Sequence, residues 1–233
     1  MQFSVIIPTL NEAPRIAGLL ERVRADAPDC EIIVVDGGST DDTAALAAAS
    51  GATVLQAGRG RGRQLAFGAG EARGNVLVFL HADTVWPAGA FTALRREPSD
   101  VDVIGGNIRL VFDGGTRFAD WLTDFYAWFR GHGLYYGDSV IFIRRDIYQA
   151  LGGIRPMPVM EDFDLRQRME RHGGTVCVQD PPIVTSSRRF KNRHPAAIFM
   201  HWLVVHGLYY AGLSNGRLIA WVYDSERRRT ADS

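Results

Sequence analysis

The stretch "VLVFLHADT", residues 76–84, decides the fold. Five apolar residues run without interruption into His81, Ala82 and Asp83. An apolar run of this length that does not alternate with polar residues indicates a strand buried on both faces. Such strands belong to parallel sheets, whose ligands bind beyond the carboxyl ends of the strands. We therefore expect His81 and Asp83 to lie at a ligand-binding edge.

The segments around this strand alternate between strand-like and helix-like patterns. Strands are predicted at residues 3–8, 31–35, 53–56, 76–80, 103–112, 139–144 and 175–178, and helices at 13–26, from about 39–42 onward, and at 63–72, 118–129 and 160–172. Apolar strands separated by helices predict an α/β fold with a parallel sheet covered on both faces. Three loops then follow strand ends, at residues 8–12, 36–42 and 81–84.

Composition and charge limit the classes of protein to which this chain can belong. Of the 233 residues, 46% are hydrophobic and 22% are charged, which is ordinary for a soluble globular protein. Lys plus Arg and Asp plus Glu both total 26, so the formal net charge is +0. The overall charge therefore does not favour a nucleic-acid partner, and any anionic ligand must be held by a local site.

Neither an export signal nor a membrane span is predicted. The N-terminus, "MQFSVIIPTLNE", lacks the basic start and apolar run of a secretory signal, and no stretch reaches the roughly 18–20 apolar residues that a transmembrane helix needs. Cys30 and Cys177 are far apart and match no metal-ligand spacing. We expect reduced thiols in a cytoplasmic protein.

Acidic residues recur at or near predicted strand ends and at the start of a predicted helix. They are Asp36, Asp83 and the cluster Glu161, Asp162 and Asp164. One such carboxylate often only caps the next helix. Two on neighbouring strands would repel each other, so a cation or hydrogen-bond donors should lie between them. A divalent ion with oxygen ligands, shared with substrate phosphates, suits this position.

A stretch rich in glycine and arginine lies between Asp36 and Asp83. In residues 57–74, glycines at 58, 60 and 62 alternate with Arg59, Arg61 and Arg63. Glycine lets the backbone approach an anion, arginine can grip phosphate with two hydrogen bonds, and the following helix offers its N-terminus. The alternative is a flexible solvated turn. Placed between two strand-end acids, the stretch suggests a nucleotide diphosphate bound with a metal ion.

The acidic cluster at residues 161–164 has two interpretations. Asp162 and Arg166 are four residues apart, as are Asp164 and Arg168, which is the spacing of ion pairs on a solvated helix face. The preceding loop contains two glycines and two prolines, a composition suited to presenting the start of a helix at a cleft. The composition of this loop favours the second interpretation, in which the cluster contains a functional carboxylate.

Five ordered motifs resemble glycosyltransferase family 2. They are "VIIPTLNE", "IIVVDGGSTDDT", "GRGRQLAFGAGEARGNVLVFLHADT", "YGDSVIFIRRDIYQALGG" and "VMEDFDLRQRM", and the resemblance covers roughly residues 3–190. It implies a GT-A (Rossmann-like) fold with a mixed, mostly parallel sheet flanked by helices, followed by C-terminal helices. It also implies an inverting transfer from a nucleotide-sugar donor, with a UDP-sugar favoured, to a hydroxyl acceptor, with Mn²⁺ or Mg²⁺.

The resemblance also implies roles for individual residues. Asp162, with Glu161 beside it, would be the general base, and Asp83 would bind the metal. The residues expected around the nucleotide-sugar are Pro8, Asn11, Glu12, Asp36, Arg61, Arg63, Gln64, His81, Ala82, Asp83, Arg188 and Arg189. Gly137 and Asp138 would contact the acceptor, although Asp138 could equally be a turn carboxylate satisfied by backbone amides.

The motif at residues 81–83 departs from the family pattern. Most relatives have Asp-x-Asp where this chain has His81-Ala82-Asp83. A hard ion bound to diphosphate prefers oxygen ligands, so we favour His81 as a hydrogen-bond partner of ribose or phosphate over direct metal ligation. The motif "FLHADT" and the terminal "RLIAWVY" resemble a short bacterial subgroup associated with arsenosugar biosynthesis.

We expect one GT-A domain over residues 1–190, with a nucleotide-binding half at about 1–112 and an acceptor half at about 113–190. Residues 191–233 would form a helical extension on the same domain. The apolar stretch 196–213 could pack on the domain, form a dimer face or lie peripherally on the inner face of a membrane, so monomer and homodimer both stay open. A nucleotidyltransferase and a non-catalytic nucleotide-sugar-binding module are the rival functions.

Overall fold

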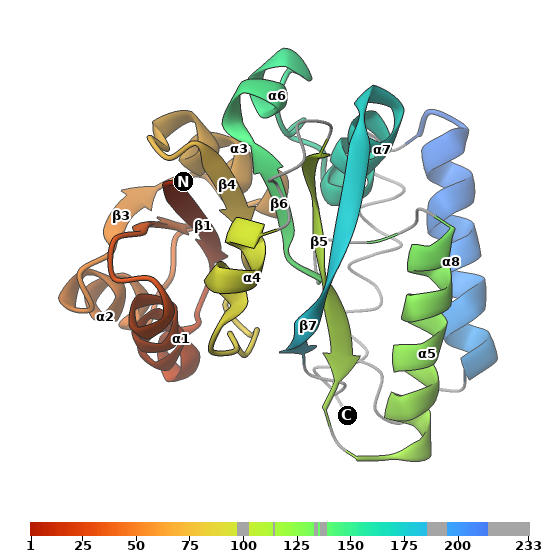
Figure 1. Ribbon diagram of the computed structural model, residues 1–233, viewed down its shortest axis with the longest axis horizontal. Coiled ribbons are helices and arrows are strands. Elements are labelled where there is room, and N and C mark those ends of the chain that lie inside the picture. Colours follow the sequence, from red (N-terminus) through yellow and green to blue (C-terminus); the bar gives the residue numbers. More distant parts are fainter. Residues whose placement is uncertain (97–102, 114, 133–134, 136–138, 186–194, 214–233) are drawn as a thin grey trace.

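A computed structural model of the chain describes residues 1–96, 103–113, 115–132, 135, 139–185 and 195–213 (Figure 1). The strands are β1 Phe3–Thr9, β2 Glu31–Asp36, β3 Thr53–Gln56, β4 Val76–Phe79, β5 Val103–Phe112, β6 Ile141–Arg144 and β7 Gly174–Thr185. The helices are α1 Ala13–Asp26, α2 Thr43–Ala49, α3 Arg61–Glu71, α4 Ala90–Arg96, α5 Arg117–Gly131, α6 Arg145–Ala150, α7 Glu161–His172 and α8 Pro195–Tyr210.

The seven strands form one sheet in the order β3-β2-β1-β4-β6-β5-β7. Neighbouring strands are parallel except that β6 runs antiparallel to both β4 and β5. The predicted mixed, mostly parallel sheet flanked by helices is therefore confirmed. Because β6 is reversed, its first residue, Ile141, pairs with Phe79 at the end of β4. The segment that enters β6 thus lies at the same edge as the loop that leaves β4.

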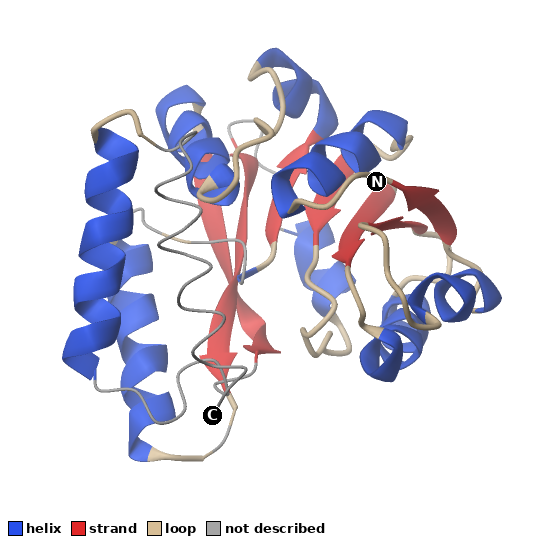
Figure 2. Cartoon of the chain, turned by 180° about the vertical axis from the view of Figure 1, so that it is seen from behind, coloured by secondary structure: helices blue, strands red, loops and turns tan. Residues whose placement is uncertain are grey.

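Helices cover both faces of the sheet (Figures 1 and 2). On one face, α1, α2, α4 and the first half of α5 pack on a core that includes Ile16, Phe91 and Leu122. On the other face, α3, α6 and α7 pack on a second core that includes Leu65 and Leu165. The central strands are apolar throughout because both of their faces are buried, as the sequence pattern predicts.

The structure differs from the sequence prediction mainly in the second half of the chain. Two short helices, α4 and α6, are absent from the prediction, because six or seven residues give too few turns for a helical period to be recognised. Strand β7 runs to Thr185 rather than ending at residue 178. Pro181 and Pro182 argue against a strand, but β7 is the edge of the sheet, where proline is tolerated.

The C-terminal helix α8 packs on the domain through one of its sides. Val205 is buried in a small cluster with Phe163 of α7, and the Tyr209 hydroxyl lies 3.2 Å from Asp164. Elsewhere on the helix Met200 and Leu203 are exposed. None of the described helices combines the length and the apolar character needed to cross a membrane.

Helix α3 approaches the sheet closely at Gly68. A Cβ atom at this position would lie 2.7 Å from methyl groups of both Ile6 and Val35. At Gly70, two residues further along the same helix, a Cβ atom would meet nothing within 4 Å. The absence of a side chain at Gly68 therefore lets α3 lie against β1 and β2.

This difference predicts opposite effects of one substitution at two positions. Gly68→Ala should lower the free energy of unfolding by about 1–3 kcal/mol because the added methyl group overpacks the core. Gly70→Ala should raise it by about 0.5–1 kcal/mol because alanine favours the helix. Urea denaturation followed by circular dichroism measures both, and equal effects at the two positions would contradict the close packing.

Candidate active site

The loops that follow β1 and β2 are joined by hydrogen bonds at the carboxyl edge of the sheet. The Asn11 side chain accepts a hydrogen bond from the Thr40 amide (2.9 Å), and the Asn11 amide donates to the Ser39 hydroxyl (2.9 Å). The Glu12 amide donates to the Thr43 hydroxyl (2.8 Å) at the start of α2. Two of the three predicted loops therefore form one continuous surface.

Asp36 is buried at the end of β2, and its carboxylate holds the loop that follows. One carboxylate oxygen accepts from the amides of Gly38 (3.1 Å) and Ser39 (2.9 Å). The other accepts from the hydroxyls of Ser39 and Thr9. Burial acts to raise the pKa of Asp36, but these hydrogen bonds outweigh it and the pKa lies below its ordinary value. The four bonds use the usual accepting capacity of a carboxylate.

Gln64 connects α3 to the same edge. Its side-chain amide donates to the carbonyl oxygens of Thr9 (2.9 Å) and Val35 (2.7 Å), and the residue is 4% exposed. Gly37 lies directly against it, because a Cβ atom there would come within 3.0 Å of the Gln64 side chain. Gln64 thus fixes the start of α3 relative to the ends of β1 and β2.

Arg61 connects the glycine- and arginine-rich stretch to the acidic cluster. Its Nε donates to the Glu161 carboxylate, and one of its terminal nitrogens lies 3.4 Å from the Asp162 carboxylate. A Cβ atom on Gly62 would lie 3.1 Å from the Glu161 side chain and from the Met157 carbonyl oxygen. The glycine therefore permits the starts of α3 and α7 to meet, which places the acids beside the two loops described above.

The acidic cluster is buried, which excludes the solvated-face alternative. Glu161, Asp162 and Asp164 are 1%, 7% and 4% exposed. Burial raises the pKa of Glu161, the Arg61 guanidinium opposes this, and the neighbouring Asp162 charge adds to it. Asp164 pairs with Arg168 (2.7 Å) at the expected four-residue spacing. Of the two leading acids, Asp162 has the more accessible side chain, 10% exposed against 1% for Glu161.

His81 and Asp83 lie in the turn that follows β4, and both are partly exposed. Within the described residues, no group of three or more His, Cys, Asp and Glu side chains is arranged to hold a metal ion. One carboxylate with one imidazole beside it fits an ion that takes most of its ligands from substrate phosphates, as Mg²⁺ and Mn²⁺ commonly do. The residues present therefore fit a shared metal ion.

Three non-glycine residues in the described parts of the chain have left-handed backbones, and all adjoin this edge. Asn11 (φ 56°) follows β1, Val140 (φ 54°) precedes β6, and Met160 (φ 68°) precedes α7. The conformation is most costly for a β-branched residue such as Val140. Strain of about 1–3 kcal/mol per residue is retained where the surrounding structure imposes it, and it concentrates at functional sites.

The other residues predicted to line the nucleotide-sugar site differ in how exposed they are and in what they contact. Pro8 lies within β1, half-buried. Ala82 is 5% exposed with its side chain in the core, so only its backbone can face a ligand. Glu12 pairs with Arg15 (2.8 Å), and Arg63 is exposed beside Gly58.

Four predicted site residues cannot be placed. Gly137, Asp138, Arg188 and Arg189 lie outside the described residues. Their roles in acceptor and diphosphate binding stay predictions.

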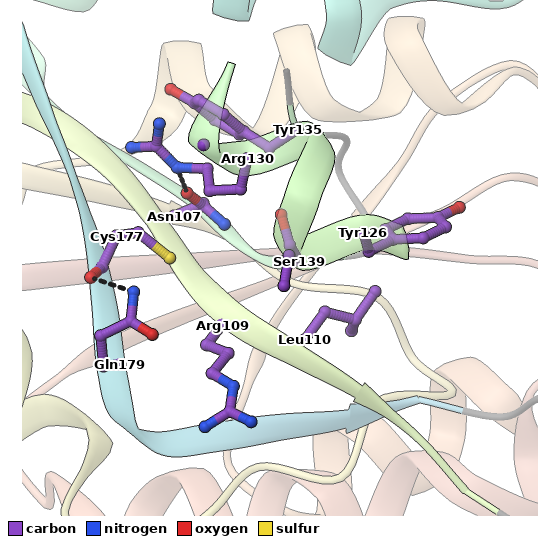
Figure 3. Close-up of a pocket in the computed structure, with 11 residues that line it drawn as sticks. Asn107, Arg109, Leu110, Tyr126, Arg130, Tyr135, Ser139, Cys177 and Gln179 are labelled. Atoms are coloured by element: carbon purple, nitrogen blue, oxygen red, sulfur yellow. Dashed lines mark hydrogen bonds between the residues drawn. The ribbon is translucent and has the colours of Figure 1, made fainter. Parts of the chain in front are cut away.

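A pocket of about 380 Å³ was not predicted from the sequence (Figure 3). It lies between β5, β7 and the second half of α5, and Asn107, Arg109, Arg130 and Tyr135 are among the residues that line it. An arginine inside the apolar strand at residues 103–112 was the available signal. It carries little information alone, because alternate residues of a strand can face solvent.

Removing Arg61 should destabilise the protein. Arg61→Met leaves two adjacent buried carboxylates without their cation, so we expect the free energy of unfolding to fall by about 2–4 kcal/mol. Arg63→Met, on an exposed neighbour in the same helix, should change it by less than about 0.5 kcal/mol. Thermal and urea denaturation near neutral pH compare the two variants. Similar losses in both would show that the ion pairs at α7 contribute nothing specific.

Known proteins resemble this chain in sequence and in fold. Glucosyl-3-phosphoglycerate synthase of Mycobacterium tuberculosis is 33% identical over 99 residues, which cover 38% of this chain and 31% of that protein. Its crystal structure with Mn²⁺, UDP and glucosyl-3-phosphoglycerate superposes with a TM-score of 0.61 at 22% identity, covering 92% of this chain and 81% of that one. The matches span less than half the length of the first curated relatives.

The mannosyltransferase PcManGT of Pyrobaculum calidifontis, in complex with GDP-Man and Mn²⁺, has a TM-score of 0.67 at 20% identity, covering 96% of this chain and 70% of that one. At such identities a structural likeness speaks for the fold alone. The sequence profile of glycosyl transferase family 2 matches residues 4–152, well over half of the 233 residues. The chain belongs to glycosyl transferase family 2.

Proposed function

We propose that this protein is an inverting glycosyltransferase, which moves a sugar from a nucleotide diphosphate to a hydroxyl acceptor. The observation that carries the proposal is the contact of Arg61 with Glu161 and Asp162. It brings the acids of α7 to the edge where the loops after β1 and β2 meet, in a chain of the matching family. Ligands of parallel sheets bind at this edge.

The donor would lie across the loops that follow β1, β2 and β4. The exposed Arg63 at the start of α3 offers hydrogen-bond donors to a diphosphate. The family relatives solved with UDP or with GDP-Man support a nucleotide-sugar donor, and we favour a UDP-sugar. Asp36 would act on the donor mainly by holding its loop, since its oxygens already accept four hydrogen bonds.

A divalent cation would be held by Asp83, with His81 bonding to ribose or phosphate. Mn²⁺ is present in the solved complexes of both relatives described above. When bound, such an ion offsets the negative charge that develops on the departing diphosphate.

Asp162 is the candidate general base. It would take the proton of the acceptor hydroxyl as that oxygen bonds to the anomeric carbon, while the bond to the diphosphate breaks and its electron pair leaves with the phosphate oxygen. Attack from the face opposite the leaving group inverts the anomeric configuration. Asp162 suits this role better than Glu161 because its side chain is the more accessible. Arg61, which contacts both acids, would be a positioning residue.

Replacing the proposed base should abolish transfer and spare donor binding. Asp162→Asn should lower the rate of UDP-sugar hydrolysis or transfer by about 10²–10⁴-fold, the usual contribution of general base catalysis, with little change in the Kd for UDP. Asp146→Asn, on the exposed start of α6, is the matched control. A nucleotidyltransferase would instead release pyrophosphate, and a binding module would show no dependence on Asp162. Wild-type turnover in Asp162→Asn refutes the assignment.

The metal assignment has its own test. In the wild-type protein Mn²⁺ should tighten UDP binding, as measured by calorimetry with and without the ion. Asp83→Ala should remove this gain, whereas His81→Gln, which keeps a hydrogen-bonding side chain, should retain most of it. If the gain persists in Asp83→Ala and disappears in His81→Gln, then the imidazole and not the carboxylate is the ligand.

A further inference from the structure

The pocket beside α5 is built from polar side chains that the donor site does not use. Asn107 and Ser139 line it and are 2% and 3% exposed, and Tyr135 beside them is 3% exposed. Arg109 and Arg130 supply positive charge, and the described lining residues include no Asp or Glu (Figure 3). Buried polar groups and two arginines without a carboxylate favour an anionic ligand.

Arg130 is fixed by its surroundings. Its Nε donates to the Asn107 side chain (2.6 Å), and the guanidinium lies 4.6 Å from the centre of the Tyr135 ring. On its other side it approaches the Glu170 carboxylate (3.8 Å) and the Thr175 hydroxyl (3.4 Å). Glu170 offsets part of its charge, so Arg109, which is exposed, supplies much of the net positive charge in the pocket.

The Tyr135 hydroxyl has hydrogen-bonding capacity that a ligand in the pocket could use. It is buried and has no well-formed hydrogen bond within the described residues, and the Thr175 hydroxyl is a polar group close to it. The neighbouring Thr175 hydroxyl donates its own proton to Glu170 (2.6 Å). Burying a hydroxyl without a good hydrogen bond is unfavourable, and an oxygen atom bound in the pocket would supply that bond.

Cys177 lines the same pocket and adds no negative charge. Burial raises the pKa of its thiol, which Arg130 opposes, so the thiol stays protonated near neutral pH. The pocket therefore keeps its positive character under ordinary conditions.

The pocket lies within reach of the proposed catalytic edge. Asn107 pairs with Ile141, and Ile141 pairs with Phe79 at the end of β4, two residues before His81. Two strand spacings separate Asn107 from Phe79, a distance of about 10 Å. A small acceptor held beside Asn107 would thus lie about 10 Å from the end of β4, where the loop of His81 and Asp83 begins.

We propose that this pocket binds the acceptor, and that the acceptor carries an anionic oxyacid group, carboxylate or phosphate, close to its reactive hydroxyl. Arg109 and Arg130 would bind the anion, and Tyr135 would donate a hydrogen bond to it. This proposal rests on the proposed glycosyltransferase function and adds the chemical class of its acceptor.

Three small hydroxyl compounds test the charge preference in the full chain with UDP and Mn²⁺ present. Glycerate, glycerol 3-phosphate and neutral glycerol share a three-carbon skeleton, and their Kd values are measured by calorimetry or ligand-observed NMR. Glycerate or glycerol 3-phosphate should bind at least about tenfold more tightly than glycerol, as expected for charge-assisted hydrogen bonds. The stronger of the two identifies the anion. Equal binding of all three would overturn the proposal.

Two variants and a control locate the site. Arg109→Gln should weaken binding of the preferred anion about tenfold. Tyr135→Phe should weaken it without loss of thermal stability, because the hydroxyl has no well-formed hydrogen bond within the described residues. Arg117→Gln, an exposed arginine of α5 outside the pocket lining, should change nothing. Anion binding that is unchanged in both Arg109→Gln and Tyr135→Phe would place the site elsewhere and refute the proposal.

The same samples separate this proposal from the one on which it rests. UDP binding and Asp162-dependent hydrolysis of the donor report on the glycosyltransferase function alone, since neither requires an acceptor. If they are present and anion selectivity is absent, only the acceptor class is wrong. If UDP does not bind but the anions still do so through Arg109, the pocket is an anion site and the transferase proposal fails.

Discussion

The architecture of the site depends on one buried contact, between Arg61 and the two acids that begin α7. Glu161 and Asp162 are adjacent and almost fully buried. Two such carboxylates would be costly in a low-dielectric interior unless a cation lay beside them. Arg61 supplies that cation from 100 residues earlier in the chain. The contact requires α3 and α7 to touch at their first turns, which Gly62 permits by having no side chain.

This contact gives the glycine- and arginine-rich stretch a structural role within the chain. As sequence, alternating glycines and arginines indicate a phosphate-binding loop. In the structure, one of its arginines pairs with carboxylates of the same chain, one of its glycines makes that pairing possible, and Gln64 fixes the start of the helix. The stretch therefore contributes to the structure of the candidate site through contacts within the chain. Arg63, which is exposed, is left as the arginine of α3 best placed for a phosphate.

The sequence predicts the first half of the fold closely and the second half less well, for physical reasons. Strands β1, β2 and β4 and helix α1 carry strong local signals, because their apolar residues follow the pattern of a buried strand or of one helix face. The part of β7 after residue 178 carries no such signal, since Pro181 and Pro182 interrupt it and are tolerated because β7 is the edge of the sheet. Pairing between distant residues, such as Arg61 with Glu161, is set by packing and cannot be read from either segment alone.

Asp36 illustrates the same limit within the candidate site. An aspartate after an apolar strand, followed by glycines and a serine, fits a ligand-binding carboxylate and equally fits one that closes its own loop. The two cases differ in the number of hydrogen bonds that the carboxylate accepts from its own chain. Here Asp36 accepts three from its own loop and one from Thr9 at the end of β1, which uses its four accepting positions. Specificity then has to come from groups with unused bonding capacity. The buried Tyr135 hydroxyl is one such group in the described part of the chain, and Tyr135 belongs to the same buried cluster as Ile141 and Ile143 of the reversed strand β6. In the proposed function, the regular parallel half of the sheet would hold the donor, whereas the irregular half after β4 would supply the groups that distinguish one acceptor from another.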